Sequence, residues 1–363
     1  MKLVSPLLKH VVYPGLSKAG CLRGPARAGP AVLTYHGVLP AGYQIVDPRL
    51  DGNLVNTDSF RRQLRFLKDH YNVISPAEFL LWCEGTHEVP PRSVLLTCDD
   101  GLRNCLFDML PILQEFEIGC LFFVTGASLS RTPTMLWYEE LYLMFLAAPE
   151  SFALELLEIG MQAKASRQEK HSLWWELVKR LSQYDLNHRK ILLGRIRMQL
   201  RLAEQWDAEY REDPVRSRRF LVLDQPELQQ LARVGMCIGA HTLSHPMLSQ
   251  SSPDMAWNEI SESKRNLEQV LEHETWAMAY PFGDSSSVTS RELQMAKRAG
   301  FKAAFLNVDG ASRKRPSRFA LPRIHIAAAM TLSELEARIS GFHQSLLEFL
   351  RPARLSAAAG SSA

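Results

Sequence analysis

Seven short apolar runs rich in β-forming residues recur along the chain, and stretches with helical periodicity lie between them. Phe60, Leu64 and Leu67 mark one helical stripe, and Ser75 followed by Pro76 is a typical start of another helix. Strands that alternate with helices indicate a parallel sheet with crossover helices, either an α/β barrel or a doubly wound sheet. The expected strands are AVLTYH (31–36), YNVIS (71–75), SVLLTC (93–98), CLFFVTG (120–126), MCIGAH (236–241), TWAMAY (275–280) and KAAFL (302–306).

The segment at about 127–224 interrupts this alternation. We expect no strand in it, only charged helical stretches, and interpret it as a helical insertion after the fourth strand. Its arginines, among them Arg216, Arg218 and Arg219, are expected to face water, with an acidic partner or lipid head groups as the alternative. The expected organisation is an extension at 1–30, an α/β domain with its insertion at 31–330, a helix at 331–355 and a disordered tail at 356–363.

The composition is that of an ordinary globular chain of 363 residues, with 46% hydrophobic and 22% charged residues. A formal net charge of +3 gives no argument for binding nucleic acid. Six cysteines occur without a Cys-x-x-Cys pair, and a reducing, cytoplasmic location is the simpler expectation, with a peripheral membrane location or export as alternatives. No run approaches the roughly 18 apolar residues of a membrane span, and Pro6, Lys9 and His10 break the N-terminal apolar stretch.

Two adjacent aspartates, Asp99 and Asp100, follow the apolar run SVLLTC and precede Gly101. They therefore lie at the carboxyl end of an expected parallel strand, where ligands and catalytic groups gather. Adjacent carboxylates repel each other unless one is protonated or a cation lies between them. A turn with an aspartate that caps the next helix explains the same residues equally well.

Histidines follow two other expected strands. His241 and His245 are four residues apart in GAHTLSHPML, and Pro246 favours a loop rather than a helix at His245. Two imidazoles and one carboxylate form a common divalent-metal site that leaves positions for water and substrate. His36 ends the first apolar run, and imidazole is the usual general acid or base near neutral pH, although a structural histidine is the alternative.

The turn AYPFGD (279–284) follows a further expected strand. We expect it to present the backbone N–H of Phe282 to a developing oxyanion, with Tyr280 as a second candidate for a substrate contact. A plain strand-to-helix turn is the alternative.

Together these motifs resemble those of the polysaccharide deacetylases, the NodB-like carbohydrate esterase family 4. The family motif Thr-Phe-Asp-Asp-Gly is matched by Thr97–Gly101 with a cysteine in second place, and His-Ser/Thr-x-x-His is matched in full by His241–His245. Of the motif Arg-x-Pro-Tyr/Phe-Gly only Pro281–Gly283 is matched, because Ala279 stands at the arginine position. The resemblance covers roughly residues 31–130 and 225–330.

The resemblance implies a distorted (β/α) barrel of parallel strands and a role for each motif residue. It makes Asp99 the base that activates water, and Asp100, His241 and His245 the ligands of one divalent metal ion, zinc or another. The charge of that ion would let the neighbouring carboxylate stay ionised, and the ion would polarise the amide carbonyl and the attacking water.

Two positions depart from the family pattern. Arg323, in LPRIHI, is predicted to replace the missing arginine that orients the catalytic aspartate. The general acid has two candidates, His325 in the expected late position and His36, which matches a permuted branch resembling poly-N-acetylglucosamine deacetylases. Strand alternation places Arg323 and His325 on the same side of their strand, which leaves two alternatives, that both face the site or that both are buried. We prefer His36 as the acid, and His325 is then a candidate for an oxyanion or substrate contact.

The resemblance predicts a metal-dependent hydrolase that removes N-acetyl groups from a sugar or polysaccharide in surface or exopolysaccharide biosynthesis. An N-acetylated saccharide is the expected partner, and association with a membrane surface or a biosynthetic complex is a further expectation. The insertion is expected to form a lid, in which Trp137 and Tyr138 serve core packing rather than stacking on sugar rings. Two alternatives stay open, a deacetylase or deformylase of a lipid-linked or nucleotide-linked sugar and an inactive carbohydrate-binding relic.

Overall fold

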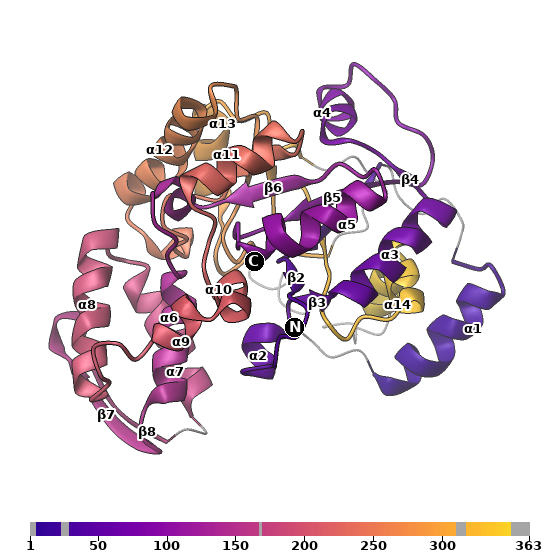
Figure 1. Cartoon of the computed structure of the whole chain (residues 1–363). Coiled ribbons are helices and arrows are strands. Elements are labelled where there is room, and N and C mark those ends of the chain that lie inside the picture. The colour runs from indigo at the N-terminus through magenta and orange to yellow at the C-terminus, as the bar shows by residue number, and fades with distance from the viewer. Residues whose placement is uncertain (1–4, 23–28, 167–168, 310–316, 350–363) are drawn as a thin grey trace, which may run out of the picture.

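The computed structural model describes residues 5–22, 29–166, 169–309 and 317–349, so the expected tail at 356–363 lies outside the described residues. Its centre is one sheet in which all neighbouring strands run parallel (Figure 1). The strand order is β11-β10-β9-β6-β5-β1-β12, and β4 pairs with the start of β5. The strands are β1 (Ala31–Tyr35), β4 (Asn72–Val73), β5 (Ser93–Cys98), β6 (Leu121–Val124), β9 (Cys237–Ala240), β10 (Ala277–Ala279), β11 (Ala303–Phe305) and β12 (Ile324–His325).

This sheet curls into a distorted (β/α) barrel. Leu321, just before β12, forms a parallel bridge with Phe305 of β11, so the two ends of the strand order are linked. Helices cover the outside of the sheet, and its strands are therefore apolar and buried along almost their whole length. All seven predicted strands are present, each within its predicted range, and the predicted distorted barrel is confirmed.

The register of the sheet brings the ends of its central strands to one rim. Tyr35 pairs with Cys98, and both Val124 and Met278 pair with Ala240. Residues that directly follow these strands therefore meet at the same edge of the barrel. They are His36 after β1, Asp99 after β5, His241 after β9 and Tyr280 after β10.

Two helices around the barrel form where the sequence predicts them. The stripe of Phe60, Leu64 and Leu67 is buried in α3, and Ser75 caps α4, with Pro76 in its first turn. A short parallel pair, β2 (Val38–Leu39) with β3 (Val55–Asn56), lies outside the main sheet. The helices are α1 (Tyr13–Lys18), α2 (Pro48–Asp51), α3 (Thr57–His70), α4 (Pro76–Glu84), α5 (Leu110–Glu115), α6 (Trp137–Ala147), α7 (Lys170–Leu181), α8 (Leu186–Gln199), α9 (Ala208–Glu212), α10 (Pro214–Phe220), α11 (Gln225–Arg233), α12 (Pro253–Leu271), α13 (Ser290–Arg298), α14 (Leu332–Ile339) and α15 (Phe342–Phe349).

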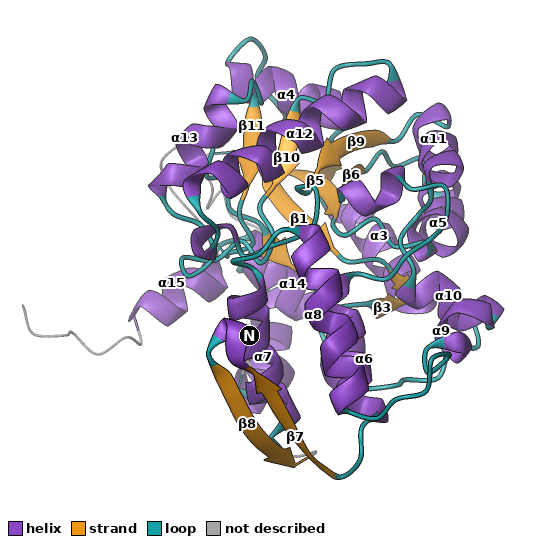
Figure 2. Ribbon diagram, turned by 90° about the vertical axis from the view of Figure 1, so that its left-hand side faces the viewer, coloured by secondary structure: helices purple, strands orange, loops and turns teal. Residues whose placement is uncertain are grey.

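The insertion between β6 and β9 contains α6 to α10 and also an antiparallel hairpin of β7 (Ser151–Leu156) and β8 (Met161–Ser166), drawn in orange at the bottom of Figure 2. The prediction that this block holds no strand is therefore wrong. The sequence SFALEL contains strong helix formers, but its apolar residues alternate, so that Leu154 and Leu156 are buried and Glu155 is exposed. Packing of this apolar face in the insertion's own core overrides helix propensity.

The three arginines that were expected to face water all pair with carboxylates of the protein. Arg219 of α10 is fully buried, with its Nε 2.8 Å from Asp51 Oδ1 and its Nη2 2.9 Å from Glu139 Oε1. For Arg219 the expectation of a solvated charge is wrong, because two buried carboxylates compensate its guanidinium. The other two, Arg216 and Arg218, pair with Glu209 and Asp108.

The two ends of the described chain pack against each other. Helix α1 lies against α14, and Tyr13 Oη is 2.6 Å from His343 Nδ1. Of the helix expected at 331–355, residues 350–355 lie outside the described residues, and the described part forms two helices, α14 and α15, because the chain turns at Gly341, whose φ is +79°. Within the described ranges, no helix combines the length and the apolar character that a membrane span needs.

Candidate active site

A pocket of about 390 Å³ opens at the rim where the central strands end. Eight of the nine residues predicted for the site line this pocket, and the ninth, Arg323, contacts Asp99. The structure thus gathers side chains from five distant segments of the sequence at one place. The eight are His36, Asp99, Asp100, His241, His245, Tyr280, Phe282 and His325.

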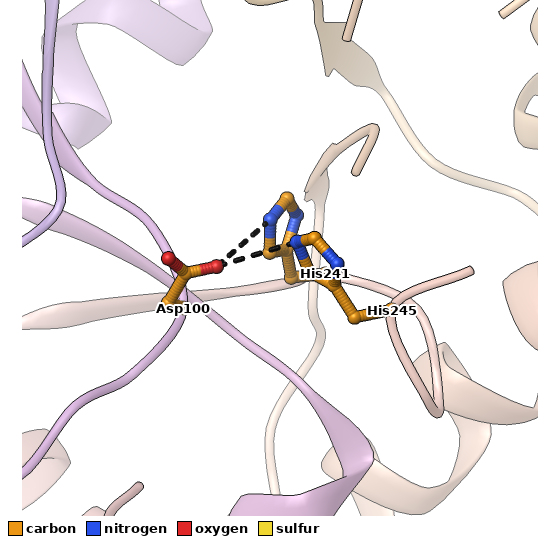
Figure 3. Close-up of side chains that lie close together, drawn as sticks. All are labelled: Asp100, His241 and His245. Atoms are coloured by element: carbon orange, nitrogen blue, oxygen red, sulfur yellow. Dashed lines mark ion pairs between the residues drawn. The ribbon is translucent and has the colours of Figure 1, made fainter. Parts of the chain in front are cut away.

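Asp100, His241 and His245 point toward one another in this pocket (Figure 3). Asp100 Oδ1 lies 3.6 Å from His241 Nε2 and 3.3 Å from His245 Nε2. Ligands of a tetrahedral zinc ion, each about 2.1 Å from the metal, lie roughly 3.4 Å from one another. The three donor atoms are all within 4.8 Å of one another, so the residues fit a single divalent ion.

The surroundings of the three side chains also suit metal binding. His241 Nδ1 lies 2.8 Å from the carbonyl oxygen of Ala279, a contact in which Nδ1 carries the proton and the Nε2 lone pair is left free. Burial favours a higher pKa for Asp100, but the contacts with the two histidines hold that pKa well below its usual value. Asp100 Oδ1 is buried and has no hydrogen-bond partner among the described residues, so a cation there would satisfy it.

Asp99, the neighbour of Asp100, forms a bidentate ion pair with Arg323. Arg323 Nη1 donates to Asp99 Oδ1 and Nη2 donates to Oδ2, both at 2.6 Å, and both residues are almost fully buried. The Arg323 Nε also donates to the carbonyl oxygen of Leu306, and Nη1 donates to Thr97 Oγ1. Burial favours a higher pKa for Asp99, but the Arg323 guanidinium and His241 hold that pKa below its usual value. Arg323 therefore lies where the missing motif arginine was expected to act.

His36 and His325 lie side by side in the pocket, with ring centroids 4.9 Å apart. The Nε2 of His325 is 3.3 Å from Asn53 Oδ1. Burial, with the nearby charge of His36 as the next cause, lowers the pKa of His325 to about 3. Arg323 and His325 lie on the same side of the chain, as strand alternation predicts, and of the two open alternatives the structure shows that both face the site.

The AYPFGD turn contributes to the pocket through Phe282. This residue has a φ of +60°, and within the described ranges its backbone N–H has no hydrogen-bond partner. Its ring centroid is 4.9 Å from that of His245. Tyr280 also lines the pocket, but its hydroxyl donates to the carbonyl oxygen of Phe319 at 3.1 Å and so is already engaged.

The insertion supplies aromatic side chains that the sequence analysis did not assign to the site. Trp137 is buried, as expected for core packing, but Tyr138 lines the pocket and its hydroxyl donates to Asp100 Oδ2 at 3.3 Å. Trp174 and Trp175 of α7 also line the pocket and were not anticipated. The signal available in the sequence was the pair of adjacent tryptophans in the charged stretch HSLWWELVKRL, because tryptophan combines a large apolar surface with a polar N–H and is enriched at interfaces.

Comparison with known proteins agrees with this geometry. Residues 86–304, more than half of the chain, match the family model described as "Polysaccharide deacetylase". The chain belongs to the polysaccharide deacetylase family. The resemblance to the polysaccharide deacetylases that was drawn from the motifs is therefore confirmed.

The individual proteins that are similar to this chain have low sequence identity to it. The Bacillus subtilis protein YxkH, which is named as a polysaccharide deacetylase, is 25% identical over 117 residues, or 32% of this chain. The match spans only 41% of that relative. The Streptococcus pyogenes deacetylase PplD, solved in complex with acetate, superposes with a TM-score of 0.54 at 21% identity, covering 86% of this chain and 99% of PplD. IcaB from Ammonifex degensii superposes with a TM-score of 0.53 at 16% identity, covering 86% of this chain and 97% of IcaB. These two similarities show a shared fold.

Proposed function

We propose that this protein is a metal-dependent hydrolase that removes N-acetyl groups from a sugar or polysaccharide, in the biosynthesis of a surface or exported polysaccharide. The observation that carries the proposal is the adjacency of two sites in one pocket. A cluster of Asp100, His241 and His245 suited to one divalent ion lies beside Asp99, a buried carboxylate that Arg323 keeps ionised.

In this proposal Asp100, His241 and His245 hold the metal. Once bound, a divalent ion such as zinc would polarise the amide carbonyl and make the attacking water more acidic. Asp99 accepts the proton of that water, because its carboxylate is ionised at neutral pH and faces the pocket. Arg323 orients the carboxylate by binding both of its oxygens. The backbone N–H of Phe282 is free to donate to the oxyanion that develops on the carbonyl oxygen.

His36 is the general acid in the proposed mechanism. It lies in the same pocket as Asp99 and donates a proton to the departing amine. With a pKa of about 3, His325 is neutral at neutral pH and has no additional proton to supply. His325 therefore serves as a neighbour that contacts His36 and the substrate.

The walls of the pocket support an N-acetylated sugar as the substrate. Tyr138, Trp174, Trp175 and Phe282 provide aromatic surface, which stacks well on the apolar face of a sugar ring. The asparagine Asn307 lines the same pocket, and its buried Oδ1 has no hydrogen-bond partner among the described residues, so it can accept a sugar hydroxyl. The match to the polysaccharide deacetylase family model supports a polysaccharide substrate. A cytoplasmic location and association with a membrane surface or a biosynthetic complex remain predictions.

The proposal is tested by measuring acetate release from N-acetylglucosamine oligomers after the metal content of the purified protein has been determined. We expect the wild type to contain one divalent ion and to release acetate. The Asp99→Asn variant should keep the metal and lose acetate release, which separates the base from the ligands. Bound metal with no acetate from any oligomer would redirect the search to lipid-linked or nucleotide-linked sugars, and a protein that binds no metal would refute the proposal.

A further inference from the structure

We propose that the helical insertion is a working part of the metal site, because Arg189 and Trp137 hold the loop that carries both histidine ligands. This inference rests on the proposed function, since it concerns the affinity of the same site for its ion. It assigns Arg189, Trp137 and, from the barrel, Glu259 as positioning residues. The insertion is then more than a lid over the substrate.

The loop His241–His245 has a backbone that needs external support. Thr242 and His245 have φ values of +65° and +54°, in the left-handed region that residues other than glycine rarely adopt. One hydrogen bond within the loop and one from neighbouring backbone stabilise Thr242 and His245. The N–H of His245 donates to Thr242 Oγ1 at 3.0 Å, and the N–H of Gly126 donates to the Thr242 carbonyl oxygen at 3.0 Å. Ser244, the residue just before His245, is held by other elements.

Arg189 of α8 binds Ser244 with two nitrogens. Its Nη1 donates to the Ser244 carbonyl oxygen at 2.9 Å, and its Nη2 donates to Ser244 Oγ at 2.8 Å. The Nε of the same guanidinium donates to the carbonyl oxygen of Tyr184 at 3.0 Å, which fixes the side chain within the insertion. Arg189 is fully buried, so it cannot exchange these partners for water. The peptide oxygen and the side chain immediately before the second metal ligand are therefore fixed by one planar group.

Two further residues complete the support around Ser244. Glu259 of α12 accepts the Ser244 N–H at 2.8 Å and also accepts a bond from the Ser244 hydroxyl, and its Oε1 is 3.7 Å from Arg189 Nη2. The Nε1 of Trp137 donates to the carbonyl oxygens of Ser244 and His245 at 2.9 and 3.1 Å. The Arg189 guanidinium also lies over the Trp137 ring, with Arg189 Cζ 5.0 Å from the ring centroid. The insertion thus contacts the loop through α6 and α8, and the barrel contacts it through α12.

The hydrogen bonds to Ser244 hold the His245 imidazole in the orientation that binds an ion before the ion arrives. If the loop relaxes from its left-handed backbone, the His245 imidazole no longer faces Asp100 and must be reordered when the ion binds. Residues that orient metal ligands typically contribute 10–100-fold to metal affinity. Loss of the Arg189 guanidinium should therefore weaken metal binding by about 10–100-fold, although Arg189 is not itself a ligand.

The experiment measures the affinity of the full-length chain for zinc ions alone, by competition with a chelating dye, in Arg189→Met and in a matched control. Arg338→Met is the control, because Arg338 is also buried and pairs with a glutamate, Glu334, but on α14. The midpoint of thermal unfolding is measured for each metal-free protein. Both substitutions should lower that midpoint, but only Arg189→Met should weaken zinc binding.

Wild-type zinc affinity in Arg189→Met, or equal weakening in both variants, would refute the inference. If Arg189→Met does not fold, Ser244→Ala removes only the hydroxyl shared by Arg189 and Glu259 and should weaken zinc binding in the same direction. A wild-type protein that binds neither zinc nor another divalent ion would instead refute the proposed function, so the two failures can be told apart.

Discussion

Replacing Arg323 with methionine should destabilise the fold, because Arg323 compensates the charge of Asp99, one of two adjacent buried carboxylates. Arg323 contacts both oxygens of Asp99 at 2.6 Å, and the side chains are 0% and 3% exposed. Breaking a buried ion pair by removing one partner costs about 3–5 kcal/mol, because the remaining charge stays buried and unpaired. With an unfolding entropy of about 2.1 cal/mol/K per residue, 363 residues give roughly 0.76 kcal/mol/K, so the melting temperature should fall by about 4–7 °C.

The pH dependence of the stability lost in Arg323→Met separates the effect of the unpaired charge from the effect of altered packing. In the wild type the pKa of Asp99 is held below its usual value, so this residue stabilises the fold above the pKa of the unfolded chain, about 3.9. Without Arg323, burial dominates and the folded-state pKa of Asp99 rises. The folded state then holds its proton more tightly than the unfolded state, so the deficit in stability should shrink as the pH falls through the raised pKa.

Calorimetry between pH 4 and pH 8 measures both effects, with Asp99→Asn and the double variant completing a double-mutant cycle. We expect the double variant to lose less stability than the sum of the two single variants. Additive losses, or a deficit in Arg323→Met that does not change with pH, would refute this account of the pair.

Two further predictions concern the walls and the acid of the pocket. Trp175→Ala should raise the KM for an N-acetylglucosamine oligomer about 2- to 12-fold with little change in kcat, because a stacked ring contributes roughly 0.5–1.5 kcal/mol. A fall in kcat alone would show that Trp175 does not bind the sugar. His36→Asn should lower kcat by about 10²–10⁴-fold, the usual contribution of a general acid, whereas His325→Asn should lower kcat less. If steady-state assays show the larger loss of kcat in His325→Asn, His325 is the general acid.

The barrel and the metal ligands could be predicted because each of their sequence signals lies within one short segment of the chain. Apolar runs buried on both faces identify the strands of a parallel sheet, and the residue after each run then lies at the ligand-binding rim. The Asp99–Asp100 pair and the His241–His245 spacing each lie within one short segment. The role of Arg323 could be predicted because the motif lacks its arginine and Arg323 lies just before the expected late strand end at His325.

The parts that were missed depend on long-range packing. The β7–β8 hairpin contains good helix formers, and only its antiparallel partner makes its alternation decisive. Arg189 lies in a helix with many charges, and its partner Ser244 is 55 positions further along the chain. One signal was present: Arg189 precedes Leu192, Leu193 and Ile196 by three, four and seven residues, which places it on the buried stripe of α8. A charged residue on such a stripe predicts a buried partner but cannot identify it.

The conformations of the site residues explain why buried supports recur around this pocket. Eight non-glycine residues in the described ranges have a positive φ, and half of them, Asp100, Thr242, His245 and Phe282, belong to the site. Each such residue costs roughly 1–3 kcal/mol and persists only where its neighbours hold it in place. Arg189, Arg219 and Arg323 are the largest fully buried side chains, and each bonds a segment at the pocket rather than a distant part of the core. Arg189 therefore stabilises the strained loop that carries two ligands, Arg323 holds the neighbouring base, and Arg219 holds Glu139 of the pocket wall. The strained backbone is retained because it directs the ligands at one point.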